Sequence, residues 1–118
     1  MKTKPLTFLL ALTFLFLSTS SCSDDLQDAN DAYVRKDYKE AHKLYSLLAE
    51  QENSNAQDQL GWMYDQGEGV PQDHKESVKW YRLAAEQGFS QAQFKLGYAY
   101  ENGKGVKQDY VLAYMWLY

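Results

Sequence analysis

The sequence predicts an all-α protein, an α/α solenoid of about three helix hairpins preceded by a signal peptide. Three observations predict this fold. The chain repeats itself at an interval of 36 residues, apolar side chains recur at helical spacing within each copy, and glycines follow the ends of the periodic segments. No pattern typical of strands interrupts these segments. Because one hairpin cannot bury its apolar face alone, we expect consecutive hairpins to stack and share a core.

The first 21 residues are predicted to be a signal peptide. Lys2 and Lys4 supply positive charge, residues 6–17 form a largely apolar run, and small residues follow. The apolar run is shorter than the roughly 20 residues that a membrane-spanning helix needs. The leader therefore predicts export of the protein.

Cys22 is the single cysteine of the chain and directly follows this leader. Its position resembles the lipobox of bacterial lipoproteins, in which the cysteine becomes the lipidated first residue. The resemblance implies a periplasmic or outer-membrane-associated bacterial lipoprotein, held on the membrane by acyl chains at Cys22. Residues 22–25 would be a short polar tether. The alternative is an ordinary signal peptidase cut after Ser20 or Cys22, with no lipid.

Composition and charge exclude several classes of protein. The chain has 12 basic and 16 acidic residues, whereas a nucleic-acid-binding protein needs a basic surface. Hydrophobic residues at 45% and charged residues at 24% argue against disorder. One cysteine permits no disulfide within the chain and no cysteine-rich zinc site. We predict no cofactor and no metal site.

The repeat divides the chain into three hairpins, over residues 26–53, 54–89 and 90–118. Comparing residues 55–82 with residues 91–118 gives 11 identities in 28 positions. The hairpin over residues 26–53 is shorter and matches more weakly. The identical residues of the middle copy are Ala56, Gln57, Leu60, Gly61, Tyr64, Gly67, Gly69, Val70, Gln72, Asp73 and Trp80.

Each of the two longer copies contains start and stop signals for two helices. Ser54 with Gln57 forms a predicted capping box at the first helix of the middle copy, and Ser90 with Gln93 repeats it. Gly67 and its equivalent in the last copy are expected to end the first helices in a left-handed turn. The second helices are expected to start at aspartates that cap free backbone amides. These aspartates are Asp37, Asp73 and Asp109.

The motifs over residues 60–64, 67–73 and 80–88 resemble the Sel1-like repeat (SLR) family, a longer-looped relative of the tetratricopeptide repeat. Residues 96–116 match the same pattern, and residues 26–53 are closer to a tetratricopeptide hairpin. The resemblance implies a superhelix whose concave face binds proteins or peptides, commonly in secreted or envelope bacterial proteins. We therefore expect an exported, non-enzymatic adaptor whose unknown partner is a protein or peptide, with envelope proteins among the candidates.

The resemblance also places the binding residues on the inner face of each first helix. Aromatic side chains next to carboxylates there would suit an extended segment with apolar and basic side chains. Two alternatives stay open: these side chains are only solvated, or the aromatic ones pack against neighbouring hairpins. The predicted protein-binding residues are Asn55, Asp58, Trp62, Asp65, Gln91, Phe94, Tyr98 and Glu101.

The alternative function is that of a β-lactamase-like enzyme or cell-wall hydrolase, because some cysteine-rich SLR proteins carry a proposed activity of this kind. Those members have a pair of cysteines in each repeat, whereas Cys22 lies outside the repeats. A serine β-lactamase needs a lysine three residues after its serine, and no serine of this chain has one. His42 and His74 are interpreted as exposed helix residues. We predict no catalytic residue.

The last copy is predicted to be truncated. Tyr118 aligns with Arg82, whereas the matching helix of the middle copy is expected to continue to Gln87. Residues 114–118 are apolar, although the last repeat of a solenoid normally has a polar outer face. We expect a longer repeat array; a fragment or decayed copy without a function of its own is a further alternative.

Overall fold

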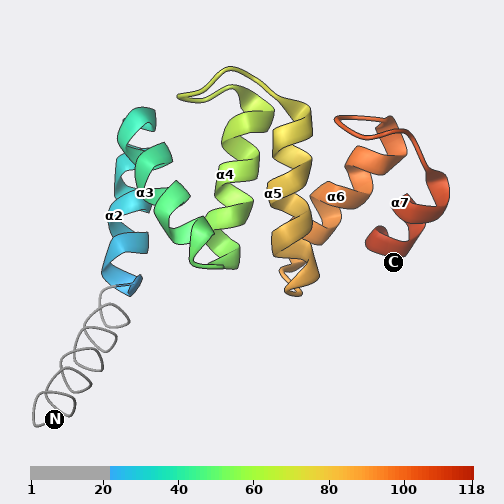
Figure 1. The fold of residues 1–118 in the computed structure, drawn as a ribbon, viewed down its shortest axis with the longest axis horizontal. Coiled ribbons are helices and arrows are strands. Elements are labelled where there is room, and N and C mark those ends of the chain that lie inside the picture. The colour runs from blue at the N-terminus through green and yellow to red at the C-terminus, as the bar shows by residue number, and fades with distance from the viewer. Residues whose placement is uncertain (1–21) are drawn as a thin grey trace, which may run out of the picture.

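The computed structural model describes residues 22–118, which form a row of six α-helices with no strand among them (Figure 1). This confirms the predicted all-α class. The predicted signal peptide over residues 1–21 lies outside the described residues. The helices are α2 (Cys22–Val34), α3 (Tyr38–Glu50), α4 (Ser54–Gln66), α5 (His74–Glu86), α6 (Ser90–Asn102) and α7 (Tyr110–Leu117).

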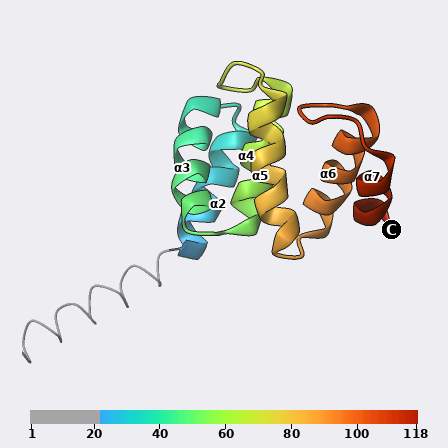
Figure 2. The same ribbon diagram turned by 45° about the vertical axis from the view of Figure 1, so that its right-hand side comes forward.

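The helices form three hairpins, α2–α3, α4–α5 and α6–α7, and each helix packs mainly against the one before it and the one after it. The long loops that connect α4 to α5 and α6 to α7 lie on the same side of the row, at the top in Figures 1 and 2. The short turns from α3 to α4 and from α5 to α6 lie on the opposite side of the row, at the bottom in Figure 1. This arrangement confirms the predicted solenoid.

The second helix of each hairpin begins at an aspartate, as predicted. The carboxylate of Asp37 accepts from the amide of Glu40 at 3.3 Å, and that of Asp73 accepts from the amide of Glu76 at 3.1 Å. Asp109 accepts from two amides in the same way. Each aspartate satisfies backbone donors that have no partner within the helix.

The predicted capping boxes at Ser54 and Ser90 are wrong by one residue. Asn53 caps α4, and its Oδ1 accepts from the amide of Ala56 at 2.9 Å. Phe89 occupies the equivalent position of α6 and provides no side-chain cap. Asparagine is as good a cap as serine, and the side chain of Asn53 satisfies a free backbone amide at the start of α4.

The glutamines assigned to these boxes link one hairpin to the next instead. The side-chain amide of Gln57 donates to the carbonyl of Ala49 at 3.1 Å, and that of Gln93 donates to the carbonyl of Ala85 at 3.2 Å. Both acceptors lie in the last turn of the preceding helix, where carbonyls lack partners within the helix. Each glutamine therefore fixes the first helix of a hairpin to the helix before it.

Two buried clusters form the core of the solenoid, and small residues allow its helices to approach closely. An added Cβ at Gly61 would lie 2.7 Å from the ring of Tyr81, so α4 and α5 approach each other closely at this glycine. The first cluster contains Ala29, Ala32, Ala41, Tyr45, Leu48, Ala49, Ala56, Leu60 and Met63. The second contains Val78, Tyr81, Ala84, Ala85, Ala92, Leu96 and Ala99.

The long loops pack back onto the preceding hairpin through their second glycine. Gly69 and Gly105 have left-handed φ angles of 74° and 75°. A Cβ on Gly69 would meet the backbone of Tyr38, and one on Gly105 would meet the backbone of His74. Tyr38 and His74 are the first residues of α3 and α5. Each loop therefore rests on the start of the previous second helix.

Both ends of the described part differ in character from the middle. Residues 22–25, predicted as a tether, form the first turn of α2, where the negative charges of Asp24 and Asp25 are favourable next to the helix N-terminus. At the other end, α7 has one buried residue, Ala113, and the side chains of Tyr114 and Met115 are each 67% exposed.

Within residues 22–118, none of the helices combines the length and apolarity needed to cross a membrane.

Candidate functional site

A cavity of about 360 Å³ lies between α4, α5 and α6 and is closed at one side by the α6–α7 loop. We call it the groove. Four of the predicted binding residues line it, namely Trp62, Asp65, Phe94 and Tyr98. The other residues that line it are Gln66, His74, Ser77, Val78, Tyr81, Lys95, Ala99 and Lys104.

The other four predicted binding residues do not line the groove. Asn55 is half-buried, whereas Gln91 and Glu101 are exposed. Asp58 is 1% exposed, which is a correction to its assignment as a residue that contacts a partner directly. Of the eight predicted binding residues, the structure therefore brings only Trp62, Asp65, Phe94 and Tyr98 together around one cavity.

Asp58 instead forms a buried ion pair with Lys95 of the next hairpin. The Nζ of Lys95 lies 2.9 Å from Oδ2 of Asp58. The same ammonium lies 5.3 Å from the ring centroid of Trp62 and 5.2 Å from that of Tyr81. Burial raises the pKa of the Asp58 carboxyl, and the charge and hydrogen bond of Lys95 oppose this shift. Lys95 thus forms part of the groove wall and holds α6 against α4.

Our reasoning from the sequence missed Lys95. The two partners belong to different copies of the repeat and are 37 residues apart, so no pattern within one helix indicates the pair. The only signal in the sequence is that their charges are opposite and that their separation is one residue more than the repeat period.

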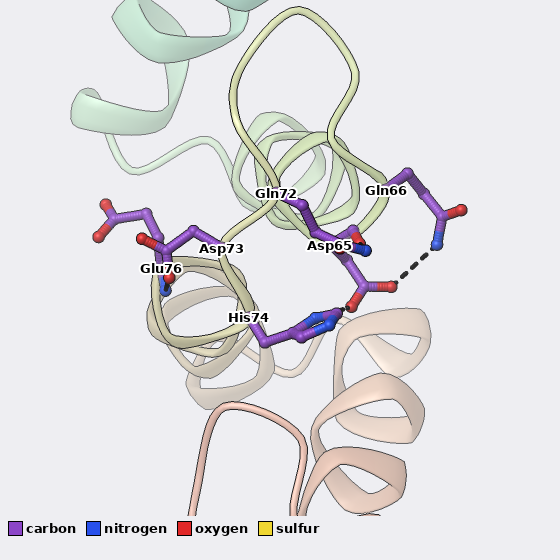
Figure 3. Close-up of polar contacts among 6 residues, drawn as sticks. All are labelled: Asp65, Gln66, Gln72, Asp73, His74 and Glu76. Carbon is purple, nitrogen blue, oxygen red and sulfur yellow. Dashed lines mark hydrogen bonds and ion pairs between the residues drawn. The ribbon is translucent and has the colours of Figure 1, made fainter.

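Asp65 is held at the edge of the groove by two side chains (Figure 3). Its Oδ1 lies 2.9 Å from Nδ1 of His74, and its Oδ2 accepts from the side-chain amide of Gln66 at 3.0 Å. His74 is half-buried, so its assignment as an exposed helix residue is wrong. Figure 3 shows Asp73 and Glu76 on the opposite side of α5, at the helix cap and away from the groove. Both carboxylate oxygens of Asp65 therefore already have partners.

The three aromatic side chains of the groove differ in how free they are. Trp62 is half-buried, and its Nε1 donates to the hydroxyl of Tyr33 at 3.0 Å. Tyr33 in turn donates to Glu68 at 2.9 Å, and burial with the Glu68 hydrogen bond raises the pKa of Tyr33 to about 12. By contrast, Phe94 is 64% exposed and Tyr98 is 47% exposed. Trp62 thus packs against a neighbouring hairpin, whereas Phe94 and Tyr98 face solvent.

Among residues 22–118, no group of three histidine, cysteine, aspartate or glutamate side chains is arranged to hold a metal ion. His42, assigned from the sequence to the exposed surface, is half-buried between α3 and α4, and its Nε2 lies 3.3 Å from the hydroxyl of Tyr64. The groove offers aromatic surface, two lysines and a paired acid, which suit contact with another chain.

Comparison with known proteins matches the chain to the Sel1 repeat over residues 29–53, 54–89 and 90–118. None of the curated proteins matches it. Among solved structures, a Sel1 repeat protein from Oxalobacter formigenes is 38% identical over 76% of this chain, with a TM-score of 0.73. The protein c5321, a protective antigen present in uropathogenic Escherichia coli strains and displaying an SLR fold, is 43% identical over 83% of this chain, also with a TM-score of 0.73.

The alignments cover only 37% of the Oxalobacter protein and 21% of c5321, so the chain spans a minor part of each. Cysteine-rich protein B of Helicobacter pylori is similar over 81% of this chain and 83% of its own, with a TM-score of 0.65. At 19% identity, this likeness shows the fold alone. The family match covers most of the chain in three consecutive copies, and the chain therefore belongs to the Sel1 repeat family.

Proposed function

We propose that this protein is a non-enzymatic scaffold that binds a peptide or protein segment in the groove between α4 and α6. A Sel1 repeat fold is consistent with a protein–protein interaction scaffold. The observation that carries the proposal is that Phe94 and Tyr98, 64% and 47% exposed, stand on the wall of a cavity of about 360 Å³.

Aromatic side chains in such a position gain free energy when a partner covers them. Phe94 and Tyr98 lie one turn apart on α6, so both point toward the same side of the helix. Aromatic residues are enriched among those that contribute most to binding, because they bury a large area with few rotatable bonds. The buried pair of Asp58 and Lys95 holds the helix that carries them in place.

The binding proposal is tested by capture from the native envelope with the full chain. The wild type is compared with the double variant Phe94→Ala, Tyr98→Ala and with the control Tyr114→Ala, which removes an aromatic side chain that is 67% exposed outside the groove. We expect a partner that the wild type and the control retain and the double variant loses. A partner retained equally by all three proteins would contradict the proposal, provided that circular dichroism shows each of them folded.

The proposal also states that the chain performs no catalysis. Support comes from its family, whose fold suits interaction scaffolds. The purified protein should not turn over a chromogenic cephalosporin. Turnover that persists after a second purification and falls in point variants of the groove would contradict this part of the proposal.

We also propose that the protein is an exported lipoprotein anchored through Cys22. The support is the sequence of the leader and the position of the single cysteine after it. Mass spectrometry of the protein from the membrane fraction should find an acylated Cys22 at the N-terminus, and Cys22→Ala should release the protein from that fraction. An unmodified N-terminus at Ser21 or Ser23 would contradict the lipid anchor.

A further inference from the structure

The charges of the groove differ from those expected from the sequence, and the difference bears on which ligand it accepts. The predicted ligand was a segment with basic side chains, because Asp58 and Asp65 were expected to face it. In the structure Asp58 is 1% exposed and paired with Lys95. Asp65 accepts from His74 and Gln66 through its two oxygens. Asp58 is therefore withdrawn from the surface of the groove, and Asp65 is held at its edge by two side chains.

The groove also contains two lysines that retain capacity for an anion. An ammonium has three donors, and the hydrogen bond of Lys95 to Asp58 uses one of them. The side chain of Lys95 is 28% exposed where it lines the groove. Lys104 is exposed and lies 5.9 Å from the ring centroid of Tyr98, and it forms no ion pair with any residue between 22 and 118. The groove thus presents two ammonium groups beside the single carboxylate of Asp65.

An internal comparison between the repeats supports this assignment. Glu68 occupies the position in the α4–α5 loop that Lys104 occupies in the α6–α7 loop. The carboxylate of Glu68 accepts from the hydroxyl of Tyr33, so the charged group of the earlier loop already has a partner within the chain. In the later loop the sign of the charge is reversed, and the lysine lines the groove with no ion-pair partner among residues 22–118.

We propose that the occupant of the groove is a peptide segment in which a bulky apolar side chain lies next to an acidic one. The apolar side chain packs against Phe94 and Tyr98, and the carboxylate accepts from Lys95 and Lys104. Charge-assisted hydrogen bonds of this kind are stronger than neutral ones, and the surrounding aromatic rings reduce the screening by water. This inference rests on the proposed function, because it assigns the chemistry of the ligand for the same groove.

The test uses two blocked pentapeptides, acetyl-Gly-Phe-Glu-Phe-Gly-amide and the same peptide with lysine in place of glutamate. Each is titrated into the full chain while the indole N–H signal of Trp62, assigned with Trp62→Phe, is followed by NMR. We expect the acidic peptide to bind roughly tenfold more tightly than the basic one at low ionic strength, and added salt to reduce this preference. Equal affinity, or tighter binding of the basic peptide, would overturn the inference.

Variants of one exposed lysine localise the effect without disturbing the core. Lys104→Glu should abolish or reverse the preference for the acidic peptide, whereas Lys107→Glu, in the same loop but outside the groove, should preserve it. Equal loss in both variants would overturn the assignment, since it would show only the effect of net charge.

The outcomes separate this inference from the proposed function. If neither peptide shifts the Trp62 signal while capture of the envelope partner still depends on Phe94 and Tyr98, the inference fails and the binding function stands. If capture is independent of these two residues as well, both fail.

Discussion

Lys95 and Asp58 come from successive copies of the repeat, and the ammonium of one lies 2.9 Å from a carboxylate oxygen of the other. The Asp58 side chain is almost completely buried, and its Oδ1 has no hydrogen-bond partner among the described residues. Burial raises the pKa of Asp58 in spite of Lys95, so the cost of desolvation exceeds the attraction. The pair therefore positions α6 against α4 more than it stabilises the fold.

This relationship predicts that the two partners respond unequally to mutation. Lys95→Met leaves a buried carboxylate without a counter-charge and should lower the free energy of unfolding by about 3–5 kcal/mol. Asp58→Asn removes the buried charge and leaves Lys95 with partial access to water, so it should cost less than about 1 kcal/mol. Urea denaturation followed by circular dichroism measures both values.

A surface pair provides the control for this comparison. Lys79 lies 3.6 Å from Glu76, and its side chain is 61% exposed. Lys79→Met should therefore change the free energy of unfolding by no more than about 1 kcal/mol. If Lys95→Met and Lys79→Met cost the same, the pair of Asp58 and Lys95 does not behave as a buried one.

Two glycines with similar backbone conformation should differ in their tolerance of alanine. Gly105 and Gly88 both have left-handed φ angles, of 75° and 89°. A Cβ on Gly105 would collide with the backbone of His74, whereas a Cβ on Gly88 would meet nothing within 4 Å. Gly88→Ala should therefore cost only the conformational strain, about 1 kcal/mol, and Gly105→Ala should cost more. Equal losses in urea denaturation would show that the α6–α7 loop moves away freely.

Substitutions in the core should lower the stability of the fold more than substitutions in the groove. Leu60 is 1% exposed, and Leu60→Ala should cost about 2–5 kcal/mol through the cavity it leaves. Tyr98→Ala, at a side chain that is 47% exposed, should cost much less. Trp62→Ala should fall between them, because it removes the hydrogen bond to Tyr33. Thermal unfolding of the three variants gives the order, and a loss for Tyr98→Ala as large as that for Leu60→Ala would show that α6 depends on this ring.

The sequence was sufficient to predict the features that local patterns determine. Asp73 and Gly67 mark the ends of helices through contacts within a few residues, and both act as predicted. The buried position of Leu60 on α4 likewise agrees with the helical spacing of apolar residues in each copy. Asn53 was missed because asparagine and serine are adjacent and are comparable caps, which leaves the register of the helix start undetermined.

The charge of the groove could not be predicted in the same way, because it depends on pairs formed across helices. Asp58 and Asp65 looked like free acids on an inner helical face. Their partners, Lys95 and His74, lie on α6 and α5, and no pattern within the sequence of α4 indicates these contacts. The identity of a face follows from periodicity, but its net charge depends on which neighbours the packing brings within about 4 Å.

His42 should make the stability of the fold depend on pH below neutrality. Burial lowers the pKa of His42 from its usual value of 6.5, so the unfolded chain binds a proton more readily than the folded one. The contribution to stability is complete above pH 6.5 and is lost as the pH falls through the lower pKa of the folded state. His42→Phe keeps an aromatic ring against Tyr64, where the two centroids are 5.6 Å apart, and removes the titration. The melting temperature of the wild type should therefore fall further between about pH 7.5 and 5.5 than that of the variant. Parallel decreases in the two proteins would mean that protonation of His42 does not destabilise the folded state. Burial between α3 and α4 would then not lower the pKa of His42.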